Sequence, residues 1–326
     1  MKREYCTLFD SNYLVKFVAM HESLCKVGAG FQITAFCFDD LAYEMLEALG
    51  LEGVSRVSLA ELEAQNPALL GVKSDRSPVE YCWTATPALP MYIFATRPEL
   101  DEITYLDADL MFFSSPEPIF NELGDDSILI TPHRFAPQYA AQVENGIYNV
   151  QFMSFRRDGR GIKCLQWWHD RCIEWCYYRL EDGRLGDQKY LDDWPERFEG
   201  VHVLEHKGGG LGPWNIPQYD LSRRDGIKMV DDDPLIFFHY HRVKTLHGGR
   251  VAWRPPGYAI SRFERRFVYD PYIAALHVAR ERVLAVDPSF SAGLEHGPDL
   301  SERARKAVAG ARASVKASAI GTLVRR

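Results

Sequence analysis

The chain has 326 residues, of which 46% are apolar and 25% are charged, and its formal net charge is −7. This composition is ordinary for a globular protein and supplies the core of one large α/β domain, with or without appendages. The acidic balance argues against the concentrated basic face of a nucleic-acid-binding protein, so small molecules or saccharides fit better as partners.

The first hundred residues alternate short apolar strands with amphipathic helices. Strands are predicted at residues 5–9, 31–38 and 54–59, and helices at residues 13–26 and 41–49. Residues 80–96 are apolar on most sides and predict a buried helix bent at Pro87 and Pro90. Such alternation predicts a mainly parallel sheet with helices on both faces, in which ligands bind at the carboxyl ends of the strands.

Residues 103–113 (ITYLDADLMFF) place two aspartates between apolar segments. In an extended segment Asp107 and Asp109 point to the same face, while Ala108 points to the other. Two like charges at the end of a buried strand need a cation or a proton to compensate them, and hard oxygen ligands suit Mg²⁺ or Mn²⁺. The alternative is that Asp107 caps the following segment and Asp109 is a solvated turn residue.

Two further strands are predicted at residues 127–131 and 147–155, and the second carries the polar Asn149. A buried polar side chain needs a partner, which is either the backbone or a ligand hydroxyl. Residues 164–180 predict a helix whose aromatic side chains are interpreted as core and interface filler rather than as a platform for a sugar. Asp187 either caps the short helix that follows it or serves a site, and the two roles are compatible.

A glycine-rich segment and a histidine-rich segment follow. Residues 206–215 contain three successive glycines and predict a loop whose backbone amides approach an anion or a sugar. Residues 235–244 predict a strand with His239 and His241 on one face, ending in basic residues. A histidine at a strand end is a candidate third metal ligand, and Lys244 is a candidate phosphate contact. The alternative is a pair of surface histidines on an edge strand.

The sequence beyond Arg262 has helical patterns and becomes basic and alanine-rich from Ser301. We predict that residues 301–326 form a mobile basic tail, which either contacts an anionic membrane or is simply solvated. The seven cysteines are odd in number and lack Cys-x-x-Cys spacing, which predicts reduced thiols in a cytoplasmic protein. Without a secretory signal or an apolar run of about 18 residues, we expect a soluble protein, at most peripheral at the inner face of the cytoplasmic membrane.

Several of these segments resemble, in their order, the nucleotide-sugar-dependent glycosyltransferases of the GT-A fold, specifically the family-8-like bacterial enzymes. The segments are FDSNYLVKFVAMHESL, YLDADLMFF, YNVQFMSF, GDQKYLDDW, and the pair GPWN and FHYHRVK. In that family the first segment is the strand and helix that hold the nucleotide, and the second is the metal-binding strand. The third is a strand with an asparagine that contacts the donor sugar, and the fourth is an Asp-Gln segment beside the reacting carbon. The last pair corresponds to a closing His/Gly/Lys/Pro-Trp segment. The resemblance covers about residues 5–246.

The resemblance implies a catalytic domain at residues 1–260 and a helical C-terminal extension at residues 261–326. It implies transfer of a sugar from a nucleoside-diphosphate sugar, with uridine as the expected base, to a saccharide or lipid-linked acceptor. It also implies retention of configuration and a bound Mn²⁺ or Mg²⁺. The expected setting is bacterial surface polysaccharide synthesis.

Carried over residue by residue, the resemblance implies three metal ligands, namely Asp107, Asp109 and His239. The residues that it implies for binding the donor are Phe9, Asp10, Asn12, Tyr13, Asp107, Ala108, Gly209, Gly210 and Lys244. The residues that it implies beside the reacting carbon are Asn149, Asp187 and Gln188.

The chain departs from the family pattern at two points. Gln151 stands where the family often has a glycine after its asparagine, and the histidine segment follows the Pro-Trp pair instead of containing it. The choice between His239 and His241 as the metal ligand is therefore open.

A haloacid-dehalogenase-like phosphatase is the main alternative function. That family also uses a strand followed by Asp-x-Asp, with the first aspartate as nucleophile and the second as acid/base, and Thr131 matches its threonine. Against it, Met111 stands where that family has threonine or valine, and three predicted strands precede Asp107. A non-catalytic saccharide-binding protein is a further alternative, which the presence of both aspartates disfavours.

Overall fold

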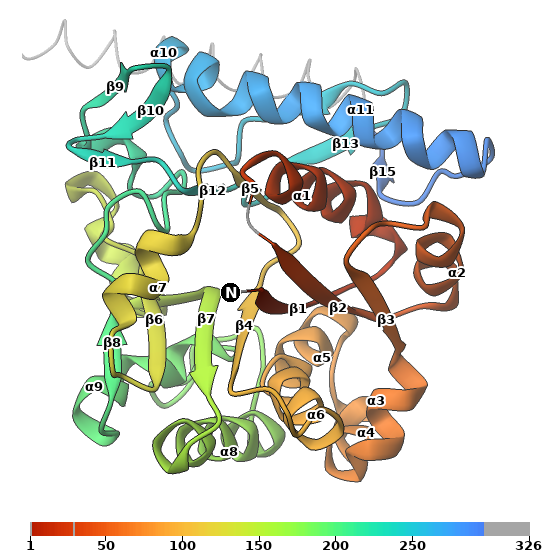
Figure 1. The fold of residues 1–326 in the computed structure, drawn as a ribbon, viewed down its shortest axis with the longest axis vertical. Coiled ribbons are helices and arrows are strands. Elements are labelled where there is room, and N and C mark those ends of the chain that lie inside the picture. Colours follow the sequence, from red (N-terminus) through yellow and green to blue (C-terminus); the bar gives the residue numbers. More distant parts are fainter. Residues whose placement is uncertain (1, 29, 297–326) are drawn as a thin grey trace, which may run out of the picture.

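The computed structural model describes residues 2–28 and 30–296 (Figure 1). The predicted basic tail at residues 301–326 lies outside the described residues. In the part of the chain that is described, no helix is both long enough and apolar enough to cross a membrane.

A seven-stranded sheet with the order β3-β2-β1-β4-β7-β6-β8 forms the centre of the fold. Its strands are β1 (Arg3–Phe9), β2 (Phe31–Cys37), β3 (Val54–Ser58), β4 (Glu102–Leu106), β6 (Ile128–Pro132), β7 (Tyr148–Arg156) and β8 (Val201–Val203). Neighbouring strands are parallel except at β7, which is antiparallel to β4 and β6. This arrangement confirms the predicted mixed, mainly parallel sheet. The carboxyl ends of β1 and β4 therefore meet at one edge.

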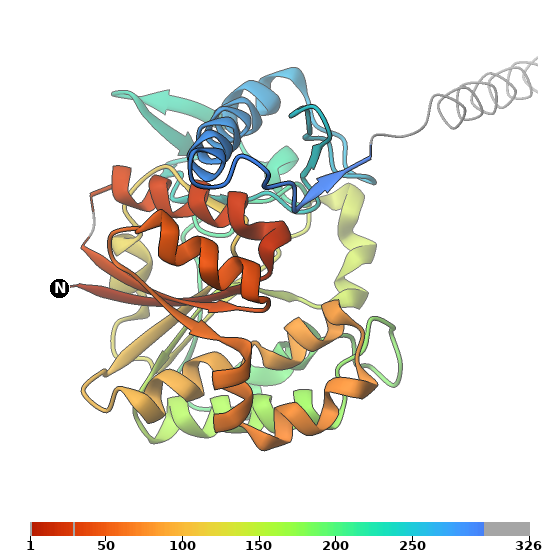
Figure 2. The same cartoon turned by 90° about the vertical axis from the view of Figure 1, so that its right-hand side faces the viewer.

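Helices cover both faces of the sheet, as Figure 2 shows. On one face lie α1 (Leu14–Lys26), α2 (Asp40–Leu49) and α11 (Asp270–Val286), and on the other lie α3 (Leu59–Gln65), α4 (Pro67–Val72), α5 (Pro78–Ala85), α6 (Ala88–Thr96) and α8 (Gly159–Glu174). Each layer buries its own hydrophobic core: Phe17, Leu46 and Leu276 belong to the first, and Leu62, Leu89 and Trp168 to the second. Because α11 packs into the first core, the C-terminal helix is part of the same body as α1.

Local sequence signals explain where several helices begin and end. The Asp39 side chain accepts a hydrogen bond from the Ala42 N–H (2.7 Å) and so caps α2, which Gly50 ends in the left-handed conformation. The predicted bent helix at residues 80–96 is in fact two helices, α5 and α6. They separate at Pro87, because proline has no N–H to continue the helical hydrogen bonds.

The predicted strand at residues 235–244 is wrong, since the structure divides it into two short strands. β12 (Phe237–His239) pairs antiparallel with β5 (Leu110–Phe112), and β13 (Lys244–Leu246) follows after a turn. Arg242 in this turn has a left-handed backbone (φ 58°), which a continuous strand excludes. Likewise, the predicted helix at residues 164–180 is α8, which ends at Glu174 because Trp175 is extended.

The remaining elements are short. They are α7 (Glu117–Leu123), α9 (Trp194–Arg197), α10 (Arg262–Glu264), β9 (Leu221–Arg224), β10 (Ile227–Val230), β11 (Asp233–Pro234), β14 (Val251–Ala252), β15 (Leu294–Glu295), the 3-10 turns η1 (Ser11–Tyr13), η2 (Lys73–Asp75), η3 (Pro137–Asn145), η4 (Gln188–Asp193) and η5 (Ile216–Gln218), and the π-helical turn η6 (Arg265–Tyr269). β15 pairs in parallel with β13, which brings the end of the described chain back onto the body of the protein.

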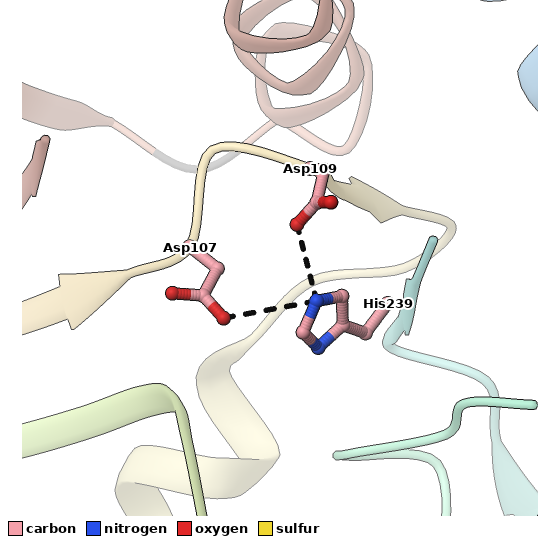
Figure 3. Close-up of side chains that lie close together, drawn as sticks. All are labelled: Asp107, Asp109 and His239. Carbon is pink, nitrogen blue, oxygen red and sulfur yellow. Dashed lines mark ion pairs between the residues drawn. The ribbon is translucent and has the colours of Figure 1, made fainter. Parts of the chain in front are cut away.

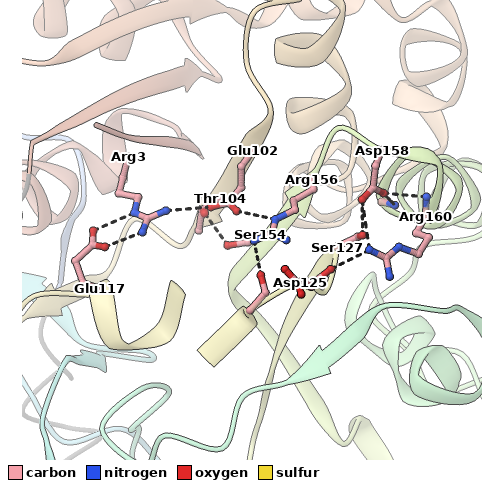
Figure 4. Close-up of polar contacts among 12 residues, drawn as sticks. Arg3, Glu102, Thr104, Glu117, Asp125, Ser127, Ser154, Arg156, Asp158 and Arg160 are labelled. Atoms are coloured by element: carbon pink, nitrogen blue, oxygen red, sulfur yellow. Dashed lines mark hydrogen bonds and ion pairs between the residues drawn. The ribbon is translucent and has the colours of Figure 1, made fainter. Parts of the chain in front are cut away.

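A network of ion pairs fixes the opposite edge of the sheet (Figure 4). Arg3 at the start of β1 pairs with Glu117 (2.7 Å) and Glu102 (3.5 Å), and Arg156 at the end of β7 pairs with the same Glu102 (3.3 Å). These residues share one edge because β7 runs opposite to β1 and β4. Charged side chains thus hold the amino ends of β1 and β4 in place, away from the edge at which their carboxyl ends meet.

Candidate active site

Two aspartates and a histidine meet just beyond the carboxyl end of β4 (Figure 3). The backbone N–H of Asp107 donates to the Gln151 carbonyl on β7, and that of Tyr240 donates to the Asp109 carbonyl, each at 3.0 Å. Asp107 and Asp109 lie in a turn between β4 and β5. The prediction of an extended backbone here is therefore wrong, although both carboxylates face His239.

The three side chains are close enough to share one ion. His239 Nε2 lies 3.1 Å from Asp109 Oδ1 and 3.7 Å from Asp107 Oδ2, and one ligand atom from each residue lies within 4.8 Å of the others. The side chains of Asp109 and His239 are each 8% exposed, whereas that of Asp107 is 27% exposed. The cluster is thus buried and opens to solvent on the Asp107 side.

The pKa shifts in this cluster follow from two buried carboxylates around one imidazole. Burial alone would raise the pKa of Asp109, but the charges of His239 and Lys16 outweigh it and hold that pKa well below its usual range. Burial raises the pKa of Asp107, and His239 offsets only part of that effect. Burial would lower the pKa of His239, yet the two carboxylates raise it. The carboxylates therefore require a cation between them, either a proton on His239 or a metal ion.

The orientation of His239 suits a metal ligand. Its Nδ1 lies 2.8 Å from Gln151 Oε1, which accepts the Nδ1–H and leaves Nε2 directed at the carboxylates. Hydrogen bonding of the second ring nitrogen in this way is the usual arrangement for a metal-binding histidine. Two carboxylates and one imidazole nitrogen are a donor set that fits Mn²⁺ or Mg²⁺. The sequence named Gln151 only as a departure from a pattern and gave no sign of this contact.

A cavity of about 520 Å³ reaches the cluster through Lys16, which lines it and whose ammonium lies 3.7 Å from Asp109 Oδ2; the three cluster residues themselves do not line it. Three residues predicted to bind the donor line it, namely Asn12, Tyr13 and Lys244. The Asn12 Oδ1 accepts the backbone N–H of Gly293 (3.0 Å), and the Lys244 ammonium is paired with Glu295 (2.7 Å). The segment around β15 therefore forms part of the cavity wall, which the sequence did not indicate.

Lys16 is a cavity residue that the sequence analysis missed. Its ammonium lies 3.7 Å from Asp109 Oδ2 and 3.8 Å from the centre of the Tyr13 ring. The available signal was a lysine at the start of the helix that follows the Asn12–Tyr13 pair, with apolar Leu14 and Phe17 around it.

Other predicted donor-binding residues do not line the cavity. Phe9 is buried and stacks on the Phe17 ring, the Asp10 side chain accepts from the Asn12 N–H (3.1 Å), and Ala108 is buried. The Gly209 N–H donates to the His206 carbonyl (3.1 Å), so this amide is already engaged. The other predicted glycine, Gly210, has a left-handed backbone (φ 85°).

The residues predicted beside the reacting carbon are held in different ways. The Asn149 amide bonds to the His133 ring (2.9 Å) and accepts the Gln151 N–H (2.9 Å). Gln188 Nε2 donates to the Asn145 carbonyl (2.9 Å). Asp187 is buried and makes no side-chain capping hydrogen bond, so its carboxyl does not cap η4 as the alternative interpretation held. Burial, assisted by the nearby negative charge of Asp107, raises the pKa of Asp187 to about 7.

The structure brings His239 rather than His241 to the aspartates. Within the described residues, the metal-competent group contains Asp107, Asp109 and His239, whereas the His241 ring lies 6.1 Å from the His239 ring, centre to centre. Burial lowers the pKa of His241 to about 4, and the neighbouring His239 adds to this effect. His241 is therefore a neutral neighbour of the cluster.

Comparison with known proteins relates the chain to both sequence relatives and a solved fold. No family model matches the chain. Two uncharacterized proteins of Bacillus subtilis (strain 168) are similar to it. YfnF is 35% identical over 233 residues, which cover 69% of this chain and 76% of YfnF. YfnD is 33% identical over 225 residues, which cover 68% of this chain and 72% of YfnD. The galactosyltransferase LgtC, in a crystal structure with donor and acceptor sugar analogs, superposes on 84% of this chain and 95% of its own with a TM-score of 0.54 at 13% identity. The chain therefore belongs to the same family as YfnF and YfnD, and its fold is that of the GT-A glycosyltransferases.

Proposed function

We propose that the chain is a metal-dependent glycosyltransferase, similar to the family-8 enzymes, that moves a sugar from a nucleoside-diphosphate sugar to a saccharide or lipid-linked acceptor. Uridine is the proposed base. The observation that supports this most directly is the Asp107–Asp109–His239 cluster at the carboxyl end of β4, beside a cavity of about 520 Å³, in a chain with the GT-A fold. The presence of donor and acceptor sugar analogs in the LgtC complex supports the two classes of partner.

The proposed chemistry assigns separate tasks to the residues around the cavity. Asp107, Asp109 and His239 would hold Mn²⁺ or Mg²⁺, which when bound supplies a Lewis acid to the diphosphate leaving group. Asn12 and Tyr13 would contact the nucleoside side of the donor, and Lys244 would contact phosphate once it leaves Glu295.

The sugar would lie between the metal cluster and the buried Asp187. Asn149, Asp187 and Gln188 are the proposed contacts of the sugar. We propose retention of configuration, with the acceptor hydroxyl attacking from the side of the leaving group, which requires these side chains to position the two reactants rather than to form a covalent bond. A pKa near 7 for Asp187 would let it hold a proton close to the reacting hydroxyls at neutral pH.

The structure disfavours the phosphatase alternative. Thr131, which matched the threonine of that family, is fully buried, and its hydroxyl donates to the Phe152 carbonyl (2.9 Å). It is therefore engaged away from Asp107 and Asp109. The fold is also that of a different enzyme class.

Thermal stability with a panel of ligands tests the proposed function. The native chain and Asp109→Asn would be melted with UDP, GDP, CDP or inorganic phosphate, each with and without Mn²⁺. A ligand at 100 times its dissociation constant adds about 2.7 kcal/mol to the free energy of unfolding, which is readily seen as a shift in melting temperature. Asp232→Asn is the matched control, because the Asp232 side chain is 97% exposed on a distant hairpin.

We expect metal-dependent stabilisation by one nucleoside diphosphate in the native chain and in Asp232→Asn, and its loss in Asp109→Asn. The diphosphate that stabilises the protein identifies the base of the donor. Stabilisation by Mn²⁺ with phosphate alone, and by none of the nucleotides, would reject the glycosyltransferase in favour of the phosphatase.

A further inference from the structure

Four basic side chains line the cavity beside the metal cluster, namely Lys16, Arg242, Lys244 and Arg280. Within the described part of the chain, Lys16 is the one that pairs with an aspartate of the cluster, with its Nζ 3.7 Å from Asp109 Oδ2. The Arg242 guanidinium donates to the Tyr178 hydroxyl (3.1 Å), and the Lys244 ammonium is neutralised by Glu295 (2.7 Å). Lys16 therefore stands at the junction between the cavity and the cluster.

The Lys16 side chain is largely buried, and its surroundings hold the ammonium in place. The side chain is 12% exposed, and the ammonium lies over the face of the Tyr13 ring, 3.8 Å from its centre. Cation–π contact and the negative charge of Asp109 fix the position of the cation without forming a short hydrogen bond. Burial lowers the pKa of Lys16, but Asp109 opposes this and favours the charged form.

The donor capacity of this ammonium is largely unused. A lysine ammonium has three N–H donors, and among the described residues none of them makes a hydrogen bond of 3.5 Å or less. Because Lys16 also lines the cavity, these donors are available to an anion that enters it.

We infer that Lys16 binds the diphosphate of the nucleotide donor and gives the cavity its preference for a nucleoside diphosphate over the corresponding nucleoside. This inference rests on the proposed function and adds to it a second phosphate contact besides the one proposed for Lys244. The diphosphate is the part of the donor that runs from the nucleoside to the metal cluster, and Lys16 lies on that path. Because the Lys16 side chain is 12% exposed and that of Lys244 is 48% exposed, water screens a charge-assisted hydrogen bond from Lys16 less than one from Lys244.

The experiment compares ligands that differ only in their phosphates. Native protein, Lys16→Met and Lys16→Gln would be titrated by calorimetry with uridine, UMP and UDP, or with the same series of guanosine or cytidine compounds if GDP or CDP is the stabilising ligand, all in saturating Mn²⁺. Lys228→Met is the matched control, because Lys228 is also partly buried, lies 4.1 Å from the Phe113 ring centre, and has no part in the cavity or the cluster.

We expect both Lys16 variants to bind the diphosphate roughly 10- to 100-fold more weakly than the native chain does, the size usual for a lost hydrogen bond to a charged group. The Lys16 variants should bind the nucleoside as tightly as the native chain does. Lys228→Met should bind all three ligands as tightly as the native chain does. Equal diphosphate affinity in native and Lys16 variants would overturn the inference. So would an equal loss for nucleoside and diphosphate, or unfolding of both Lys16 variants, since each would assign Lys16 to structure alone.

The two proposals fail in distinguishable ways. A native chain that binds none of the nucleoside diphosphates refutes the proposed function. A native chain that binds one of them while the Lys16 variants bind it equally well refutes only the role of Lys16.

Discussion

Asp187 combines a buried position with a neighbouring negative charge, so replacing it should make the protein more stable. Burial is the main cause that raises its pKa to about 7, and Asp107 adds to the effect. The substitution Asp187→Asn keeps the shape of the side chain and removes the ionisable group. If Asp187 positions the sugar as proposed, the same substitution should abolish sugar transfer while it raises stability.

The size and the sign of the stability effect follow from the shift in pKa. In the unfolded chain the carboxyl of Asp187 has a pKa near 3.8, and in the folded chain its pKa is about 7. The folded state therefore binds the proton more tightly. Stability that is fully present below pH 3.8 is lost as the pH rises through 7. At 1.36 kcal/mol per pKa unit the loss is at most about 4 kcal/mol. An asparagine gives up a hydrogen bond worth about 1 kcal/mol, so we expect a net gain of about 1–3 kcal/mol at pH 8.

Urea unfolding of the native chain and of Asp187→Asn at pH 5 and pH 8, in EDTA, measures this difference. We expect Asp187→Asn to be more stable than the native chain at pH 8 and to lose most of that advantage at pH 5, where Asp187 is protonated. Asp232→Asn, which alters an exposed carboxylate, should follow the native chain at both pH values. An advantage of Asp187→Asn that is absent at pH 8, or as large at pH 5 as at pH 8, would refute the assignment of a buried, proton-holding Asp187.

Two further substitutions test the surroundings of the site. Gly210→Ala should destabilise the protein by about 2–4 kcal/mol in urea unfolding, because a left-handed backbone disfavours alanine and the new Cβ would overlap Thr131 Cγ2; an unchanged midpoint would contradict the tight packing of this loop. Glu295→Gln should change stability by less than about 1 kcal/mol, since its pair with Lys244 is half-exposed. It should also tighten diphosphate binding in calorimetry if Lys244 contacts phosphate, and unchanged binding would exclude Lys244 from that role.

The strands and the aspartate pair could be predicted because their signals are local. The stretch around Asp107 is an apolar run interrupted by two charges, and β1, β2 and β3 are bounded by capping residues and glycine. The division of residues 235–244 into β12 and β13 has no such signal. It depends on the pairing of β12 with β5 and on the left-handed backbone of Arg242, both of which are set by packing in the folded chain.

The side chains that complete the site could not be predicted, because their roles depend on partners distant in sequence. Gln151 and His239 are 88 positions apart, and Lys16 meets Asp109 only after β1 and β4 have paired. The wall of the cavity contributed by Gly293 and Glu295 is equally hidden, since that segment reaches Asn12 and Lys244 across the fold. Resemblance to a family identifies only the residues that its motifs specify, and Lys16, Gln151 and Glu295 are not among them.

Gln151 offers the sharpest test of how the metal cluster is positioned. Its Oε1 accepts the Nδ1–H of His239, while its Nε2 is buried and has no hydrogen-bond partner among the described residues. An unpaired buried donor costs about 1–3 kcal/mol, so the contact with His239 is the gain that offsets it. Gln151→Met keeps the volume but removes the acceptor, and Gln151→Glu keeps an acceptor at the same place.

We expect Gln151→Met to bind Mn²⁺ 10- to 100-fold more weakly than the native chain in calorimetric titration, the range found when the outer hydrogen bond of a metal ligand is lost. Gln151→Glu should retain native affinity or exceed it, because a carboxylate accepts the Nδ1–H more strongly and adds negative charge. Equal Mn²⁺ affinity in Gln151→Met and the native chain would mean that β12 alone orients His239. The residue that departs from the family pattern would then have no part in the site.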